Sequence, residues 1–122
     1  MTTQILEMPK YVSLKVGCKV WIMIEGKPLL GKGGAAILEQ IEKQQSISKA
    51  AEKLGMSYRY VWGYLNEARK LLGEPIVQTY KGGKSGGGGA RVNDLGMRLL
   101  AEYNRISKDI ETYITRNPMA QS

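Results

Sequence analysis

Residues 57–69 include polar side chains whose chemistry suits the edges of base pairs. The guanidinium group of an arginine can donate two hydrogen bonds to O6 and N7 of guanine, and the amide of an asparagine can pair with adenine. Serine and tyrosine hydroxyls can bond a phosphate or a base edge. At helical spacing these side chains would share the face opposite an apolar stripe. We therefore expect a major groove to be read by Ser57, Tyr58, Arg59, Asn66 and Arg69.

These side chains also have a plainer explanation. Arg59 would be a solvated charge, and Asn66 an ordinary surface amide, if the helix simply faced water. Trp62 lies beside the apolar stripe, which favours packing against the preceding helix or the following hairpin over stacking on a base.

The segment KGGKSGGGGAR, residues 81–91, combines six glycines with three cations. Glycines allow a backbone to come close to a phosphate, and cations neutralise its charge. We expect Lys81, Lys84 and Arg91 to hold a nucleic-acid backbone, with Lys49 adding charge from a neighbouring helix. The alternative is a connector that contacts nothing.

The bulk composition agrees with a nucleic-acid partner. The chain has 122 residues and a net charge of +7, and residues 43–91 hold nine basic and three acidic side chains, a net +6. Binding through this charge would depend steeply on salt. With one cysteine and no histidine, we expect no disulfide, metal, cofactor or acid–base enzyme. No apolar run approaches the roughly 20 residues of a membrane span, so we expect a soluble, cytoplasmic protein with no membrane partner.

Two motifs resemble nucleotide-binding loops but fail on context. Residues 83–85 spell GKS, yet a Walker loop needs a glycine five positions earlier, where Gln78 stands. Residues 31–36 fit the pattern G-x-G-x-x-A, but the acidic partner of that pattern, Glu52, falls within a helical segment. Neither motif supports an enzyme that uses a nucleotide.

Apolar periodicity predicts the elements that position these groups. Alternation from Leu14 to Ile24 is typical of a strand with one buried face, ended by Gly26. Residues 35–45 have apolar side chains at helical spacing and form the first expected helix.

Two further helices are predicted from their caps. Ser46 or Ser48 can cap a short helix that ends at Gly55. Ser57 can cap a longer helix that Gly73 ends. The buried stripe of this longer helix is expected to be Val61, Leu65, Ala68 and Leu72.

These two helices meet the requirements of a helix-turn-helix. The motif needs a small residue where the helices touch, a turn residue that accepts positive φ, and an apolar residue that locks the second helix onto the first. Ala51, Gly55 and Val61 fill these positions, although an ordinary helical hairpin is the alternative. Segments 76–80 and 90–92 then form a hairpin across the glycine-rich loop. The expected fold class is mainly α with a small β component: a winged helix-turn-helix domain over residues 14–92.

The remaining segments flank this domain. Asn93 can cap a long final helix over residues 93–117, which Pro118 stops. Residues 1–13 are expected to be a loose segment and 118–122 a polar tail. An apolar seam along the helix predicts a homodimer, with packing back on its own domain as the alternative. The seam consists of Leu99, Tyr103, Ile106, Ile110 and Tyr113.

Four stretches of the chain are similar to one family. SISKAA (46–51), GMSYRYVW (55–62), LNEA (65–68) and GGKSGGGGA (82–90) resemble the N-terminal DNA-binding domain of ModE, the molybdate-responsive transcriptional regulators, themselves similar to LysR-type winged helices. The resemblance implies a homodimer that binds an inverted-repeat operator with its second and third helices and its wing.

ModE proteins continue into a molybdate-binding region, whereas this chain stops after the long helix, so molybdate sensing is not carried over. We expect a stand-alone transcriptional regulator that binds double-stranded DNA, with an unidentified partner supplying any signal. The alternative is a small-ligand or partner-protein binding module, built from the wing and residues 21–23, with only architectural binding of DNA.

Overall fold

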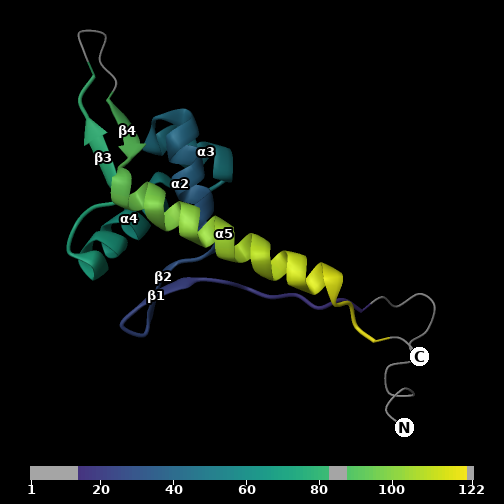
Figure 1. Cartoon of the computed structure of the whole chain (residues 1–122). Helices are drawn as coiled ribbons and strands as arrows, with labels where there is room; N and C mark the ends of the chain where they lie inside the picture. Colours follow the sequence, from purple (N-terminus) through teal and green to yellow (C-terminus); the bar gives the residue numbers. More distant parts are fainter. Residues whose placement is uncertain (1–13, 83–87, 121–122) are drawn as a thin grey trace.

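The computed structural model describes residues 14–82 and 88–120 and has a winged helix-turn-helix fold (Figure 1). The expected loose segment 1–13, Lys84 and the end of the polar tail lie outside the described residues. The expected fold class, mainly helical with a small β component, is confirmed. The elements are β1 (Ile22–Ile24), β2 (Lys27–Leu30), α2 (Lys32–Gln44), α3 (Ile47–Leu54), α4 (Tyr58–Leu72), β3 (Val77–Tyr80), β4 (Gly89–Val92) and α5 (Asp94–Arg116).

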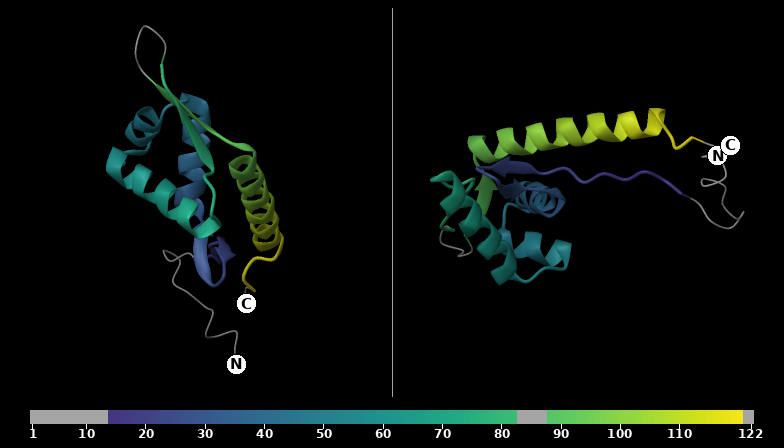
Figure 2. Two further views of the ribbon diagram at one scale, coloured as in Figure 1. Left: turned by 90° about the vertical axis from the view of Figure 1, so that its left-hand side faces the viewer. Right: turned by 90° about the horizontal axis from the view of Figure 1, so that it is seen from below.

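Three helices form the body of the domain, and three elements extend from it (Figures 1 and 2). The β3–β4 hairpin projects at one end of the body and is the wing, while the β1–β2 hairpin lies at the opposite end. α5 starts beside the wing and runs past the body, with its C-terminal half extending beyond it. This arrangement leaves α4 and the wing open to a partner.

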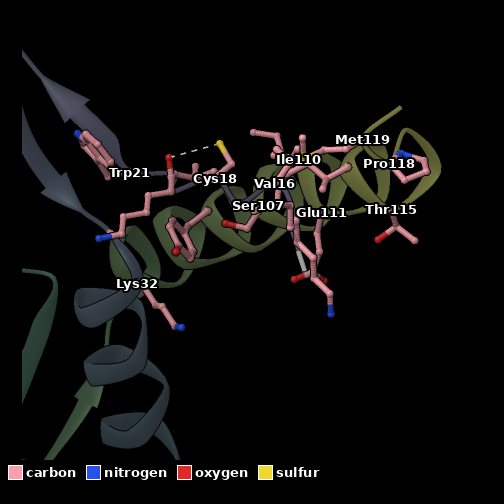
Figure 3. Close-up of a pocket in the computed structure, with 18 residues that line it drawn as sticks. Val16, Cys18, Trp21, Lys32, Ser107, Ile110, Glu111, Thr115, Pro118 and Met119 are labelled. Atoms are coloured by element: carbon pink, nitrogen blue, oxygen red, sulfur yellow. Dashed lines mark hydrogen bonds between the residues drawn. The ribbon is translucent and has the colours of Figure 1, made fainter. Parts of the chain in front are cut away.

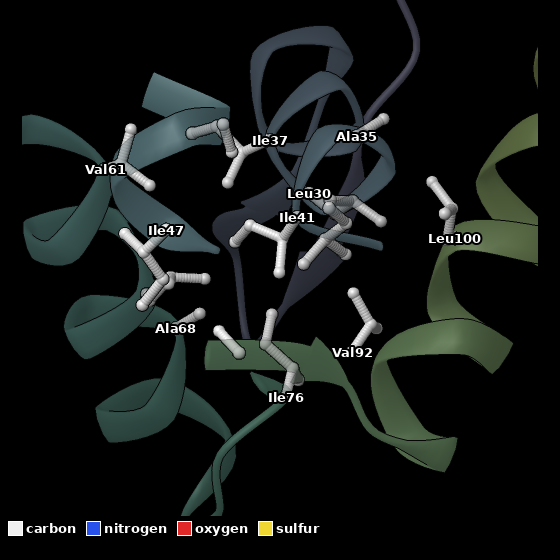
Figure 4. Close-up of a cluster of buried hydrophobic side chains, with 14 of the residues drawn as sticks. Leu30, Ala35, Ile37, Ile41, Ile47, Val61, Ala68, Ile76, Val92 and Leu100 are labelled. Carbon is white, nitrogen blue, oxygen red and sulfur yellow. The ribbon is translucent and has the colours of Figure 1, made fainter. Parts of the chain in front are cut away.

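The core is built from apolar side chains at helical spacing (Figure 4). Ile41 of α2 lies at its centre, with Val61 of α4 on one side and Leu100 of α5 on the other. Ile41 and Val61 are fully buried, and no polar or charged residue among those described is buried. Hydrophobic burial therefore fixes how α4 is oriented on the body.

The expected strand from Leu14 is wrong in most of its length. Only Ile22–Ile24 is a strand, paired antiparallel with β2 from Ile22↔Leu30 to Ile24↔Lys27. Glu25 and Gly26 form the turn with φ of 47° and 80°, as a two-residue hairpin turn requires. The alternation before Ile22 has no partner strand to pair with, because β2 is only four residues long. Residues 14–21 instead run in an extended path beside α5.

The first helix begins earlier than the expected residue 35. Lys32 starts α2, so two of the glycines expected before the helix form part of its first turn. Gly34 is required there, because a Cβ at this position would collide with the hydroxyl group of Tyr64. The close approach of α4 to α2 at this point explains the glycine.

The caps of α3 and α4 are as expected. Ser46 accepts a 3.1 Å hydrogen bond from the amide of Lys49, and Ser57 accepts a 3.0 Å bond from the amide of Tyr60. Gly55, between the two helices, takes a positive φ of 68°. The turn of the helix-turn-helix therefore depends on local signals that the sequence displays.

Asn93 joins the wing to α5. Its side chain accepts a 2.9 Å hydrogen bond from the amide of Gly96 and donates a 2.8 Å bond to the main-chain oxygen of Pro75. Its own amide donates a 3.0 Å bond to the oxygen of Ile76. One residue thus caps α5 and ties the ends of both wing strands together.

Candidate nucleic-acid interface

α4 has one buried side and one exposed side. Val61, Leu65 and Ala68 are buried against the body, as the apolar stripe predicts, whereas Leu72, the last expected member, is half-buried. Ser57, Tyr58 and Arg59 are exposed at the N-terminal end, where 54% of Tyr58 is accessible. The structure therefore leaves the polar side chains of the first turn of α4 free to meet a partner.

Two contacts hold α4 in this orientation. Across the turn, the amide of Met56 donates a 2.9 Å hydrogen bond to the oxygen of Ala51. Further along, the hydroxyl of Tyr64 donates a 2.7 Å bond to the oxygen of Leu29 in β2. Burial, and to a lesser degree the neighbouring Tyr60, raises the pKa of Tyr64 to about 12. The phenol is therefore a neutral donor at ordinary pH.

Two of the expected DNA-reading residues contact each other. Arg69 donates a 3.0 Å hydrogen bond to the side-chain oxygen of Asn66, one turn earlier on α4. Asn66 is half-buried and Arg69 exposed. An asparagine that pairs with adenine needs its amide in one orientation, and a donor on its oxygen fixes that orientation. Arg69 is thus in a position to orient the amide of Asn66.

Trp62, expected to pack against the preceding helix or the hairpin, is only partly covered. Its side chain remains 48% exposed. It follows Val61 directly and so points about 100° around the helix axis from it, at the edge of the buried stripe. Trp62 lies one turn after Arg59 and one turn before Asn66, so it joins the exposed set. The spacing alone would have placed Trp62 on the exposed face, but its apolar character favoured packing against a neighbouring element.

The wing has exposed cations and a fixed base. Lys81 and Arg91 are exposed. On β4, the amide of Ala90 donates a 3.1 Å hydrogen bond to the oxygen of Gln45, and the amide of Val92 donates a 3.1 Å bond to a carboxylate oxygen of Glu42. The end of α2 therefore supplies the acceptors that a third strand would otherwise provide. Reasoning from the sequence missed the roles of Glu42 and Gln45.

Tyr80 lies at the loop end of the paired wing strands. It is paired with Gly89 across the hairpin, and a Cβ on Gly89 would collide with the tyrosine ring. The Tyr80 hydroxyl also lies 3.5 Å from the side-chain oxygen of Gln45. The aromatic ring thus covers the glycine at the last strand pair before the glycine-rich loop.

The cations of this surface carry no ion pairs within the described part of the chain. The salt bridges found there all lie on α5, where Arg105 contacts Glu102 at 2.6 Å and Asp109 at 4.0 Å. The expected DNA-binding cations Lys49, Arg59, Arg69, Lys81 and Arg91 are all exposed. Their charge is therefore available to phosphates.

The expected seam of α5 is only partly covered. Tyr103 is buried, whereas Leu99, Ile106 and Ile110 are half-buried and Tyr113 is 67% exposed. The alternative of packing back on the same domain thus applies to the first part of the seam.

A groove of about 1270 Å³ runs between α5 and the extended residues 14–21 (Figure 3). Val16 and Cys18 line it from the extended segment, and Ser107 and Ile110 line it from α5. The hydroxyl of Ser107 has no hydrogen-bond partner among the described residues.

The described residues offer no other obvious chemistry. Among them, no group of three or more histidine, cysteine or carboxylate side chains could hold a metal ion. No helix in residues 14–82 and 88–120 is both long and apolar enough to cross a membrane.

Comparison with known proteins adds relatives but no family model, since none matches the chain. The chain is 32% identical over 80 residues to the molybdenum transport protein ModE of Azotobacter vinelandii, a match that covers 66% of this chain and 29% of that protein. It is 39% identical over 72 residues to the transcriptional regulator ModE of Yersinia pestis, covering 59% of this chain and 27% of that protein. The resemblance inferred from the motifs is confirmed. The matched part spans less than a third of the length of these curated relatives.

The fold also occurs among solved structures. The crystal structure of ArgP from Mycobacterium tuberculosis superposes with a TM-score of 0.50 at 17% sequence identity, over 67% of this chain and 28% of that chain. This likeness concerns the fold alone.

Proposed function

We propose that this chain is the DNA-binding part of a ModE-type transcriptional regulator, and that it recognises a specific sequence of double-stranded DNA with α4. One observation carries the proposal. α4 buries Val61 and Leu65 against the body, while Arg59 in the first turn of this helix is exposed to solvent. The similarity to ModE regulators supports a role in transcription.

In this proposal the N-terminal end of α4 leads into the major groove, which is wide enough to admit a helix. Arg59 would fork onto a guanine, while Ser57 and Tyr58 would bind a phosphate or base edge. Asn66, oriented by Arg69, would pair with an adenine further along the groove. The polar contacts thus follow the order of these residues along the helix.

The wing and α3 would hold the DNA backbone. Lys81 and Arg91 are exposed on the wing, Lys49 is exposed on α3, and Lys84 belongs to the same glycine-rich loop. Because β4 is bonded to the end of α2, Arg91 on this strand is held against the body that also carries α4. Phosphate contacts of this kind set the register of a protein on the duplex without reading its sequence.

We also propose that two copies pair through α5 and bind an inverted repeat. The half-buried side chains of Ile106 and Ile110, the exposed Tyr113 and the apolar groove beside them leave surface for a second copy. A two-fold pair would present two copies of α4 to successive turns of the same DNA face.

The proposed regulator acts in the cytoplasm and has no enzymatic activity. The second candidate, a ligand site shared by the wing and residues 21–23, is less favoured, because the wing and the β1–β2 hairpin lie at opposite ends of the body.

The test is selection of duplexes from a random pool by the purified chain, followed by titration of a selected and a scrambled duplex at two salt concentrations. We expect the selected duplex to bind at least about 1,000-fold more tightly. Both affinities should fall as salt is added. A plot of the logarithm of the association constant against the logarithm of the salt concentration should have a slope of about −0.9 for each phosphate contacted. Equal affinity for both duplexes at every salt concentration would contradict the proposal.

A further inference from the structure

Gly63 lies in the middle of α4, where glycine is an unfavourable choice. Glycine destabilises the interior of an exposed helix relative to alanine, because it loses more backbone entropy on folding. We therefore ask whether a glycine at this position serves the chain itself or a partner.

The chain itself does not need a glycine here. Gly34 and Gly96 lie where a Cβ would collide with other atoms of the protein, and Gly55 and Gly73 take positive φ. Gly63 does neither: its backbone is helical, and a Cβ built on it meets no side chain beyond its chain neighbours and no other part of the described chain within 4 Å. Neither of the usual reasons for glycine, a backbone requirement or a lack of space, applies inside the molecule.

The position of Gly63 points to the partner. It lies on the exposed side of α4, four residues after Arg59 and three before Asn66, so these side chains stand one turn to either side of it on the same face. The fully buried Val61 lies on the opposite side of the helix. Between two side chains suited to bases, the surface of α4 therefore has a gap one side chain wide.

We infer that Gly63 is the point of closest approach between α4 and the DNA, where the edge of a base pair comes against the helix backbone. The absence of a side chain lets the helix sit deep enough for Arg59 and Asn66 to reach their bases at the same time. Gly63 is therefore a specificity-determining residue that acts by being small. This inference rests on the proposed function of α4.

The test compares Gly63→Ala and Gly63→Leu with the wild type on a duplex selected by the wild-type chain. We expect Gly63→Ala to weaken binding about tenfold and Gly63→Leu by at least another tenfold, because the added atoms must be accommodated in the contact. Gly63→Ala should also raise the thermal midpoint of the free protein, since alanine favours the helix. If Gly63→Ala binds DNA more weakly although it is more stable than the wild type, the loss comes from a steric block and not from misfolding.

Gly33→Ala and Gly33→Leu are the matched controls. Gly33 is also a helical, exposed glycine with no atom within 4 Å of a built Cβ, but it lies in the first turn of α2. We expect these two variants to bind the selected duplex like the wild type.

The outcomes separate the inference from the function it rests on. If the wild type binds the selected duplex tightly and Gly63→Leu binds equally well, the inference is wrong and the proposed function stands. A loss that is as large in the Gly33 variants also overturns the inference. If the wild type prefers no sequence, the proposed function fails and the inference fails with it.

Discussion

Tyr64 of α4 donates a 2.7 Å hydrogen bond to the main-chain oxygen of Leu29, 35 residues earlier in the chain. The ring passes directly over Gly34, which has no side chain to obstruct it. The contact fixes the helix proposed to enter the DNA groove against the β1–β2 hairpin.

Replacing Tyr64 with phenylalanine is expected to reduce the free energy of unfolding by about 1 to 3 kcal/mol, because the oxygen of Leu29 is left without its donor. Urea denaturation measures the change. An unaltered midpoint would show that the hydroxyl contributes nothing.

The same contact predicts a dependence on alkaline pH. The pKa of Tyr64 is raised from 10.0 to about 12 in the folded protein. Its contribution to stability is therefore complete below pH 10 and is lost as the pH rises through 12. Over that range the wild type should lose up to about 3 kcal/mol more stability than Tyr64→Phe. Equal alkaline losses in the two proteins would contradict the role of the buried phenol.

Arg59→Ala is expected to cost about 1 to 3 kcal/mol of binding free energy at one base position only. Lys81→Ala and Lys84→Ala should weaken binding evenly across sequences and each reduce the salt slope by about one unit. Titration of duplexes with single base changes measures both effects. Arg116→Ala, which removes an exposed charge at the far end of α5, serves as the control and should change neither.

Arg69 and Asn66 are expected to act as a pair. Because Arg69 bonds the amide oxygen of Asn66, each single alanine variant should relax the choice of base at the position that Asn66 reads. A double-mutant cycle for binding should give a coupling energy of at least about 0.5 kcal/mol. Additive losses would mean that Arg69 does not orient Asn66.

Glu42→Ala is expected to loosen the wing. The amide of Val92 loses its acceptor, at a cost of about 1 to 3 kcal/mol of folding free energy, and should exchange its hydrogen faster. Glu42→Gln keeps an acceptor oxygen and should be milder. Glu39→Ala, on an exposed position of the same helix, is the control. Unchanged exchange at Val92 in Glu42→Ala would refute the role of the carboxylate.

Ile110→Glu is expected to convert the proposed dimer into monomers, because a charge would enter the apolar surface of α5. Sedimentation equilibrium measures the change. Thr112→Glu introduces the same charge on the opposite side of the helix and should leave the dimer intact. A wild-type chain that sediments as a monomer at high concentration would exclude pairing through α5.

Much of the fold could be predicted because its signals are local. Ser46, Ser57 and Asn93 cap helices by bonding amides three residues away, and Gly55 and Gly73 end helices with positive φ. Each of these interactions lies within a few residues of sequence, where types and spacing are informative.

The rest depends on contacts between distant residues, which a single sequence does not display. The alternation before Ile22 has the right period for a strand, but its partner strand is too short to extend the pairing. Glu42 meets Val92 across 50 residues. Trp62 shows the same limit at the proposed interface, since its apolar character is equally suited to a core and to an exposed contact surface.

The hydrogen bonds of Asn93 have a mechanical consequence. Asn93 bonds α5 on one side and the wing strands on the other, so it links a rotation of α5 to the wing. In a pair of chains joined by α5, the crossing angle of the two long helices would then set how far apart the two wings stand. Any partner that twists those helices, even far from the DNA, would then change the spacing between half-sites that the pair can bind.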